Sequence, residues 1–155
     1  MLIQSSPLLL EICSFAPQIK IDVSLYLHLH AGLRPVNWCL SKEQSPLLRL
    51  PYFWEDDCVS FDPNWVWEGP LPITDGLAIY DFHPILVVLN AVNIDGYCRL
   101  KKYLGDRSLL SVTYDEVNQF RDKKPGDEYF LDRLLEQGSG FALVSDLVEF
   151  DGDIN

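Results

Sequence analysis

Residues 19–29 alternate between apolar and polar side chains, and this pattern constrains the fold more than any other feature of the chain. Aliphatic residues occupy every second position from Ile19 to Leu29, with Lys, Asp, Ser, Tyr and His between them. Side chains of a strand point alternately to opposite faces of a sheet, so a period of two predicts a strand with one apolar face. The chain is therefore expected to build a sheet that packs on one side.

Three shorter apolar segments are predicted as further strands, because residues that stop regular structure flank each of them. Prolines frame residues 47–50 on both sides, and a proline also ends the segment 76–83. Residues 141–144 form the last predicted strand. Residues 85–89 fit either one more extended piece or a helical turn, and both alternatives stay open.

Two segments carry the signals of helices. A short helix is predicted to begin at Pro7, after two serines that suit the N-cap, and to end before Pro17. Residues 114–137 have apolar positions at helical spacing, with a break at the Pro-Gly pair 125–126. Residues 55–74 hold three prolines and are predicted as a long loop. Strands that alternate with helices predict an α/β fold with a mostly parallel sheet.

Composition bounds the domain organisation and the partners. The 155 residues predict a single domain over 1–155, with a polar tail at 151–155. The net charge of -11 repels phosphate backbones, so nucleic acid is not an expected partner. No apolar run is long enough for a membrane span and no signal peptide is recognised, so a cytoplasmic location is expected. The four cysteines form no CxxC pair and are predicted to be buried, reduced thiols.

An acidic, aromatic interval lies between Arg49 and Arg99. It contains no lysine or arginine, but it holds eight acidic residues together with Trp54, Trp65 and Trp67. Aromatic faces pack against C–H groups and carboxylates accept hydrogen bonds from hydroxyls, so the combination suits a neutral polyol such as a sugar chain. The alternative is that the tryptophans fill the core and the acids are solvated, and the sequence does not decide between the two.

His83 and Arg49 are the strongest candidates for chemistry. His83 ends a predicted strand, and ligand sites of α/β sheets lie beyond the carboxyl ends of strands, where an imidazole suits proton transfer. Arg49 lies on an apolar strand, so its charge needs a carboxylate partner. Asp56 and Asp57, just beyond that strand, are the candidate partners, although a solvated acidic loop would explain them as well.

His28 and His30 are a weaker candidate for a metal site. They stand two residues apart at the end of a predicted strand, and with His83 and a carboxylate they would complete a tetrahedral zinc site. Exposed histidines without a metal are the alternative.

The chain also resembles a known family. Residues 49–57, which begin Arg49-Leu50-Pro51-Tyr52, and the run from Gly76 to Asn90 resemble the later motifs of polysaccharide deacetylases with a NodB-type barrel, most closely the WbmS-like subgroup. Residues 130–147 resemble the last helix and strand of that barrel. The resemblance covers about residues 5–148 and implies a partial, distorted (β/α) barrel.

The resemblance implies metal-assisted hydrolysis of N-acetyl groups on a surface polysaccharide. In that family a divalent metal, usually zinc, polarises the N-acetyl carbonyl and activates a water molecule. Arg49 would orient the catalytic base, Tyr52 would help to line the site, and His83 would protonate the departing amine. The residues implied to hold the sugar are Trp54, Asp56 and Asp57.

The chain departs from the family pattern at the metal ligands. No Asp-Asp motif precedes Asp56 and no HxxxH motif precedes His28, so the metal ligands are unknown, and His28 and His30 are not taken as replacements. The resemblance therefore implies the C-terminal part of the domain, with Met1 as an internal start or a misplaced gene boundary. Such a chain is expected to bind no metal alone and to be inactive.

Three functions remain open on these grounds. The first is a polysaccharide deacetylase-like protein, truncated and inactive by itself. The second is a non-catalytic carbohydrate-binding or scaffold remnant. The third is one half of a split deacetylase, whose partner chain would carry the missing motifs. A partial barrel also leaves open sheet edges, which a partner chain or self-association would cover.

Overall fold

The computed structural model describes residues 7–38, 47–137 and 140–147. The chain divides into two compact units, which are described separately. Unit 1 contains residues 1–54, 73–80 and 139–155, and unit 2 contains residues 55–72 and 81–138. The predicted polar tail lies outside the described residues. No helix in the described part is long and apolar enough to cross a membrane.

Unit 1 is built on a small mixed sheet. Strands β1 (Ile21–Asp22), β3 (Leu47–Arg49) and β2 (Val36–Trp38) lie in the order β1-β3-β2. Strand β3 runs parallel to β1 and antiparallel to β2, so the mostly parallel arrangement expected from the sequence is not seen in this sheet. All three residues of β3 are buried, which confirms the strand predicted at 47–50.

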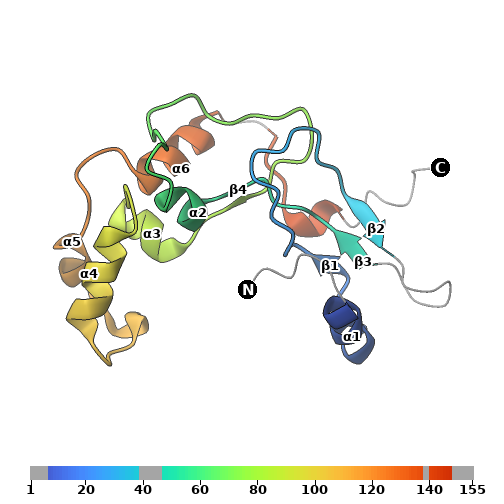
Figure 1. The fold of residues 1–155 in the computed structure, drawn as a ribbon, viewed down its shortest axis with the longest axis horizontal. Helices are drawn as coiled ribbons and strands as arrows, with labels where there is room; N and C mark the ends of the chain where they lie inside the picture. Colours follow the sequence, from blue (N-terminus) through green and yellow to red (C-terminus); the bar gives the residue numbers. More distant parts are fainter. Residues whose placement is uncertain (1–6, 39–46, 138–139, 148–155) are drawn as a thin grey trace. The chain divides into compact units, whose positions relative to one another are not determined.

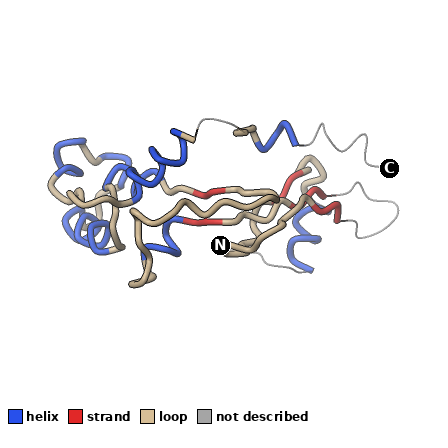
Figure 2. The backbone as a smooth tube through the Cα atoms, turned by 90° about the horizontal axis from the view of Figure 1, so that it is seen from above, coloured by secondary structure: helices blue, strands red, loops and turns tan. Residues whose placement is uncertain are grey.

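The strand predicted at residues 19–29 is shorter than expected. Regular pairing is limited to β1, and one further parallel bridge forms at Tyr26. Between β1 and Tyr26, the backbone N–H of Ser24 donates to the Asp22 carboxylate at 3.1 Å. Pro51, on the opposite segment, has no backbone N–H that could donate to a ladder. The ladder is interrupted there, and the strands, drawn in red in Figure 2, are all short.

The helix predicted at the start of the chain is confirmed as α1 (Pro7–Phe15). Its predicted N-cap serines lie outside the described residues. The strand predicted at 76–83 is reduced to β5 (Tyr80–Asp81), which pairs with β4 (Trp54–Glu55). In the loop before β5, the backbone at Gly76 packs closely against the backbone of Leu33. A Cβ atom at this position would lie 2.5 Å from the Leu33 carbonyl oxygen. Close backbone approach thus replaces strand pairing before β5.

Unit 2 is helical (Figure 1). Helix α3 (Pro84–Leu89) packs against α4 (Asp95–Leu104), α5 (Tyr114–Asn118) and α6 (Asp127–Glu136). A short helix, α2 (Asp56–Ser60), precedes them. The core that α3, α4 and α5 share consists of Leu86, Leu89, Ala91, Leu100, Leu104 and Val117. The open alternative at 85–89 is therefore resolved as a helix, and the Pro-Gly break predicted at 125–126 separates α5 from α6.

Three predictions for these regions were wrong or incomplete. Helix α2 occupies the first part of the predicted loop 55–74, whereas residues 61–74 contain no helix or strand. Helix α4 was not predicted, although Asp95 in its first turn and Lys101 and Lys102 in its last turn match the helix dipole. Residues 141–144 form no strand, because their apolar side chains are largely exposed and have no sheet to pack on.

Asn90 and Gly126 join the end of α3 to the start of α6. Asn90 takes a left-handed conformation (φ 45°) as the C-cap of α3. Its side-chain Nδ2 donates to the Lys124 carbonyl at 2.8 Å, and its side-chain Oδ1 accepts from the Tyr129 backbone N–H at 3.3 Å. A Cβ atom on Gly126 would lie 2.3 Å from the backbone carbonyl oxygen of Asn90, so this contact requires glycine. The junction sets the position of Asp127, the first residue of α6.

Candidate active site

His83 lies at the junction between strand β5 and helix α3. It is the N-cap residue of α3, and a proline follows at the first helical position. The Nδ1 atom of His83 lies 2.6 Å from Oδ1 of Asp56, and the His83 backbone N–H donates to Oδ2 of the same carboxylate at 2.5 Å. One carboxylate thus fixes both the backbone and the ring, while 43% of the His83 side chain stays exposed.

The surroundings of His83 favour its protonated form. Partial burial by itself would lower the pKa of the imidazole. The hydrogen bond that the ring donates to Asp56 and the negative charges of Asp56, Asp57 and Asp81 outweigh that effect, so the pKa of His83 is raised from its ordinary value. Because a carboxylate only accepts hydrogen bonds, Nδ1 carries the proton shared with Asp56, and Nε2 is the ring nitrogen left to donate to a ligand.

Asp127 is a second buried carboxyl group beside Asp56. Both side chains are fully buried, and each begins a helix of unit 2. Burial and the negative charge of the neighbouring Asp56 raise the pKa of Asp127 to about 9. Neither carboxyl oxygen of Asp127 has a hydrogen-bond partner among the described residues. The raised pKa keeps Asp127 protonated at neutral pH.

Asp127 was not among the candidates predicted from the sequence. An acid in the first turn of a helix, directly after a Pro-Gly pair, has an ordinary explanation in the helix dipole. Complete burial is what makes Asp127 unusual, and burial depends on how α6 packs. Asp56 and His83 were both candidates from the sequence, but their pairing across 27 positions was not predicted.

Arg49 lies in unit 1 and has a different carboxylate partner from those predicted. Its Nε atom donates to Oδ2 of Asp22 at 2.6 Å, and both side chains are buried. The guanidinium also stacks on Trp38, with 5.1 Å from Cζ to the ring centroid. The expectation of a carboxylate partner is thus correct, and its assignment to Asp56 or Asp57 is corrected to Asp22, because β1 and β3 pair Asp22 directly with Arg49.

The aromatic candidates are largely buried. Tyr52 is 4% exposed and stacks on Tyr26 with 4.9 Å between ring centroids. Trp54 is fully buried, and Trp67 is buried with its indole N–H bonded to the Val92 carbonyl at 2.8 Å. Of the two interpretations left open for the tryptophans, the structure favours core packing for Trp54 and Trp67.

The other predicted metal candidates do not converge. His28 and His30 are exposed, and His28 Nδ1 lies 2.6 Å from the hydroxyl of Tyr26. Neither histidine belongs to a group of metal-ligating atoms within the described ranges. The structure brings Asp56, Asp57 and His83 together in unit 2, whereas the remaining candidates are placed in unit 1: Arg49, Tyr52 and Trp54.

Comparison with known proteins identifies the family. The family model of the WbmS-like polysaccharide deacetylases matches residues 1–101. The chain belongs to this family. Its fold is similar to that of a Bordetella bronchiseptica protein described as a polysaccharide deacetylase involved in O-antigen biosynthesis, with a TM-score of 0.66 and 21% sequence identity. The match covers 87% of this chain and 52% of the other, so the chain spans about half the length of that protein. No curated protein matches the chain.

Members of the polysaccharide deacetylase family generally use a metal. Within each of two groups of described residues the potential ligand atoms lie within 4.8 Å of one another: Asp56 with Asp57 and His83, and Glu55 with Asp57 and Cys58. In the first group, Nδ1 of His83 is bonded to Oδ1 of Asp56, so Nε2 is the ring nitrogen left for a metal, but the raised pKa of His83 favours its protonated form. In the second, the thiol of Cys58 has a raised pKa of about 12. Metal ligands must be deprotonated, so the protonated forms of His83 and Cys58 oppose a preformed zinc site in either group.

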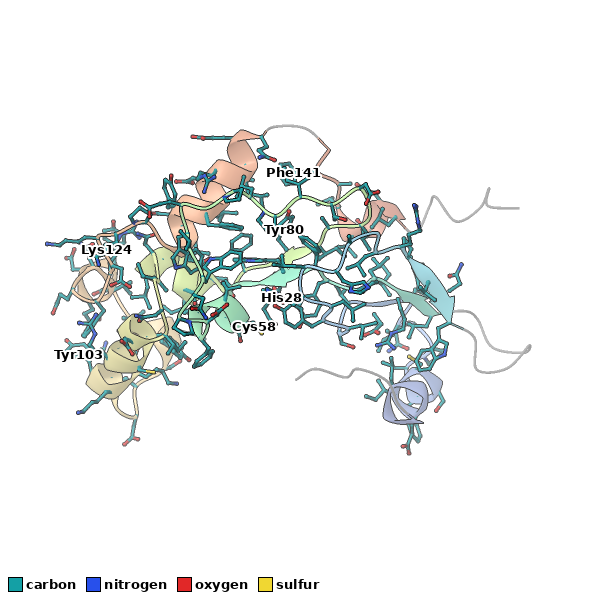
Figure 3. All side chains as sticks on the ribbon, turned by 45° about the horizontal axis from the view of Figure 1, so that its top comes forward. His28, Cys58, Tyr80, Tyr103, Lys124 and Phe141 are labelled. Carbon is teal, nitrogen blue, oxygen red and sulfur yellow. The ribbon has the colours of Figure 1, made fainter. Side chains whose placement is uncertain are left out.

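The described cysteines of this deacetylase-like chain are free, but they are not all buried. Cys13 and Cys58 are partly buried and Cys98 is exposed, so the prediction of buried thiols was wrong for Cys98. Cys39 lies outside the described residues. Cys58, on α2 (Figure 3), donates to Oε2 of Glu55 at 3.1 Å.

Cys98 is expected to react with iodoacetamide at pH 8 about a hundredfold faster than Cys58. Burial, together with the hydrogen bonds and charges of Glu55 and Asp57, raises the pKa of Cys58 to about 12, and the thiolate is the reactive form. Peptide mass spectrometry after timed labelling gives the two rates. Equal rates at the two positions would contradict the assigned surroundings of Cys58.

Proposed function

We propose that this chain provides the proton-donating part of an enzyme that removes N-acetyl groups from the amino sugars of a surface polysaccharide. The observation that carries the proposal is the buried Asp56 carboxylate that binds both the backbone and the ring of His83. Membership of the WbmS-like polysaccharide deacetylase family supplies the reaction class. A partial (β/α) barrel is the form in which we expect unit 1 and unit 2 to act.

His83 is proposed as the general acid. Hydrolysis of an amide breaks the C–N bond, and the nitrogen leaves as an amine only if it receives a proton. With Nδ1–H held by Asp56, the Nε2–H of the imidazolium is free to donate that proton. The raised pKa of His83 keeps the imidazolium populated near neutral pH. Asp56 is a positioning residue, since it fixes the ring in one orientation.

The remaining predicted residues enter the proposal in supporting roles. Arg49 is proposed to orient the catalytic base, and its guanidinium is held for this purpose by Asp22 and Trp38. Tyr52 and Trp54 are proposed as the walls that support the site, in keeping with their burial. Asp57 is proposed to contact the sugar, because Asp57 is only partly buried.

A second candidate is one half of a two-chain deacetylase. It is motivated by the Asp-Asp and HxxxH motifs of the family pattern, neither of which precedes Asp56 in this sequence. In this alternative a second polypeptide supplies the Asp-Asp and HxxxH motifs, and His83 keeps the same role.

Acetate release from N-acetylglucosamine oligomers tests the proposal. The chain is assayed alone and with the upstream half of a WbmS-like deacetylase, and each assay is repeated with His83→Gln and with Lys102→Ala, an exposed control on α4. We expect His83→Gln to lower the rate at least a hundredfold and Lys102→Ala to leave it unchanged. Release that persists in His83→Gln would overturn the assignment of the acid. Release that requires the second polypeptide would support the two-chain form.

Asp56→Asn is expected to lower the pKa of His83. The substitution removes the negative charge and an accepting oxygen, which raise the pKa of His83. It leaves the partial burial of the ring, which lowers that pKa. NMR titration of the His83 ring protons measures this directly and needs no activity. Asp106→Asn, an exposed substitution, is the control. An unchanged His83 titration in Asp56→Asn would show that the pairing does not hold in solution.

A further inference from the structure

A cavity of about 440 Å³ lies beside His83 within unit 2. Asp57 and His83 are its acidic and basic lining residues. The rest of the lining is nearly all apolar and comes from α2, α3 and α4 and the residues that cap them: Phe61, Ile85, Leu86, Ile94, Tyr97 and Cys98. The phenyl ring of Phe61 is 67% exposed, so it is available to a ligand.

The lining suits a hydrocarbon chain better than a sugar ring. A pyranose carries a hydroxyl on most of its carbons, and each buried hydroxyl without a hydrogen-bond partner costs free energy. His83, Asp57 and the hydroxyl of Tyr97 are few partners for such a ring. Methylene groups require no partner and gain from contact with Ile85, Ile94 and Leu86.

The size of the cavity also exceeds what an acetyl group needs. A water-sized group occupies about 30 Å³ of a liquid, so 440 Å³ holds on the order of ten methylene-sized groups. The acyl carbon of an amide lies only about 1.33 Å from its nitrogen. A substrate whose nitrogen receives a proton from His83 therefore begins its acyl chain next to this cavity.

We propose that the cavity binds the aliphatic acyl chain of an N-acylated amino sugar, with a chain longer than acetyl. The inference rests on the proposed function, because it takes His83 as the proton donor to the amide nitrogen. In the reaction, water adds its oxygen to the acyl carbon and gives up its protons to the solvent, the C–N bond breaks, and the amine leaves with a proton from His83, which the solvent replaces. The products are a fatty carboxylate and a free amino sugar.

Binding of N-acyl glucosamines to the full chain tests the inference without activity. Calorimetry compares acetyl, butyryl, hexanoyl and octanoyl derivatives. Each methylene that enters the cavity is expected to lower Kd about fourfold, which gives at least about a hundredfold from acetyl to octanoyl. Equal Kd values for acetyl and octanoyl derivatives would overturn the inference.

Two neighbouring substitutions on α4 locate the binding. Cys98 is exposed and lines the cavity, whereas Arg99 is exposed and does not. Cys98→Phe is expected to abolish the dependence of Kd on chain length, and Arg99→Phe to preserve it. The opposite pattern would place the acyl chain elsewhere and overturn the assignment.

His83→Gln separates this inference from the proposed function. Loss of hydrolysis with an unchanged chain-length dependence of Kd supports both. His83-dependent acetate release combined with equal Kd values for all chain lengths overturns the acyl-chain inference and leaves the deacetylase proposal standing. Chain-length-dependent binding combined with hydrolysis that does not need His83 overturns the deacetylase proposal, and with it the substrate role of the cavity.

Discussion

Asp22→Asn is expected to lower the free energy of unfolding by about 3–5 kcal/mol. Asp22 and Arg49 are each 8% exposed, and the Arg49 Nε atom lies 2.6 Å from the carboxylate. Removing the Asp22 charge from the buried Arg49 guanidinium breaks a buried ion pair from one side, which costs far more than the pair contributes as a whole. Urea unfolding, followed by the fluorescence of the buried tryptophans, measures the change.

The double variant Asp22→Leu with Arg49→Met provides the matched comparison. It removes both charges and replaces them with apolar side chains, so most of the lost stability is expected to return. Arg107→Met removes one partner of the exposed pair between Arg107 and Glu116 and is expected to have a much smaller effect. If Asp22→Asn were no more harmful than Arg107→Met, the Arg49–Asp22 pair could not be buried in solution.

Asp127→Asn is expected to stabilise the chain by roughly 2–4 kcal/mol at pH 7. The pKa of Asp127 is raised to about 9 in the folded state, and the same carboxyl group in the unfolded chain titrates near 4. Between these two pH values the folded state retains a proton that the unfolded state releases, so stability falls as pH rises through the window. Asparagine does not ionise, so it carries no such penalty.

Urea unfolding at pH 5, 7 and 9 tests the expectation for Asp127. The wild-type chain is expected to lose stability from pH 5 to pH 9, and Asp127→Asn to lose much less. Asp115→Asn, an exposed acid in the first turn of α5, is the control and is expected to keep the wild-type dependence. The same pH dependence in Asp127→Asn and the wild type would contradict a protonated Asp127.

The sequence identified the parts of the candidate site but not how they pair. His83 was found because a strand signal ends there, and Asp56 because it follows an apolar strand. Their contact depends on β4 and β5 lying together, and two strands of two residues each leave little periodic signal. Family resemblance therefore added more here than local pattern.

The same limit explains the error at Arg49. The alternation over 19–29 assigned Asp22 to the polar, outward face, but Asp22 is buried because it accepts from the guanidinium of Arg49. A charge pair can bury a residue that period-two reasoning places in solvent. Helices whose ends are marked by proline or a Pro-Gly pair, α1 and α6, were predicted, because such signals act through local geometry, whereas α2 and α4 carry no such marker and were missed.

The distance along the chain between paired segments also sets an order of assembly. Helices α3 and α4 are joined by residues 90–94 alone, so their packing closes a short loop, whereas the parallel pairing of β1 with β3 must first bring Asp22 to Arg49, 27 positions further along the chain. Closing longer loops costs more entropy and slows folding. The amide protons of Leu48 and Leu50, which bond to the carbonyls of Lys20 and Asp22, should therefore gain protection from solvent exchange later than those of α3 and α4.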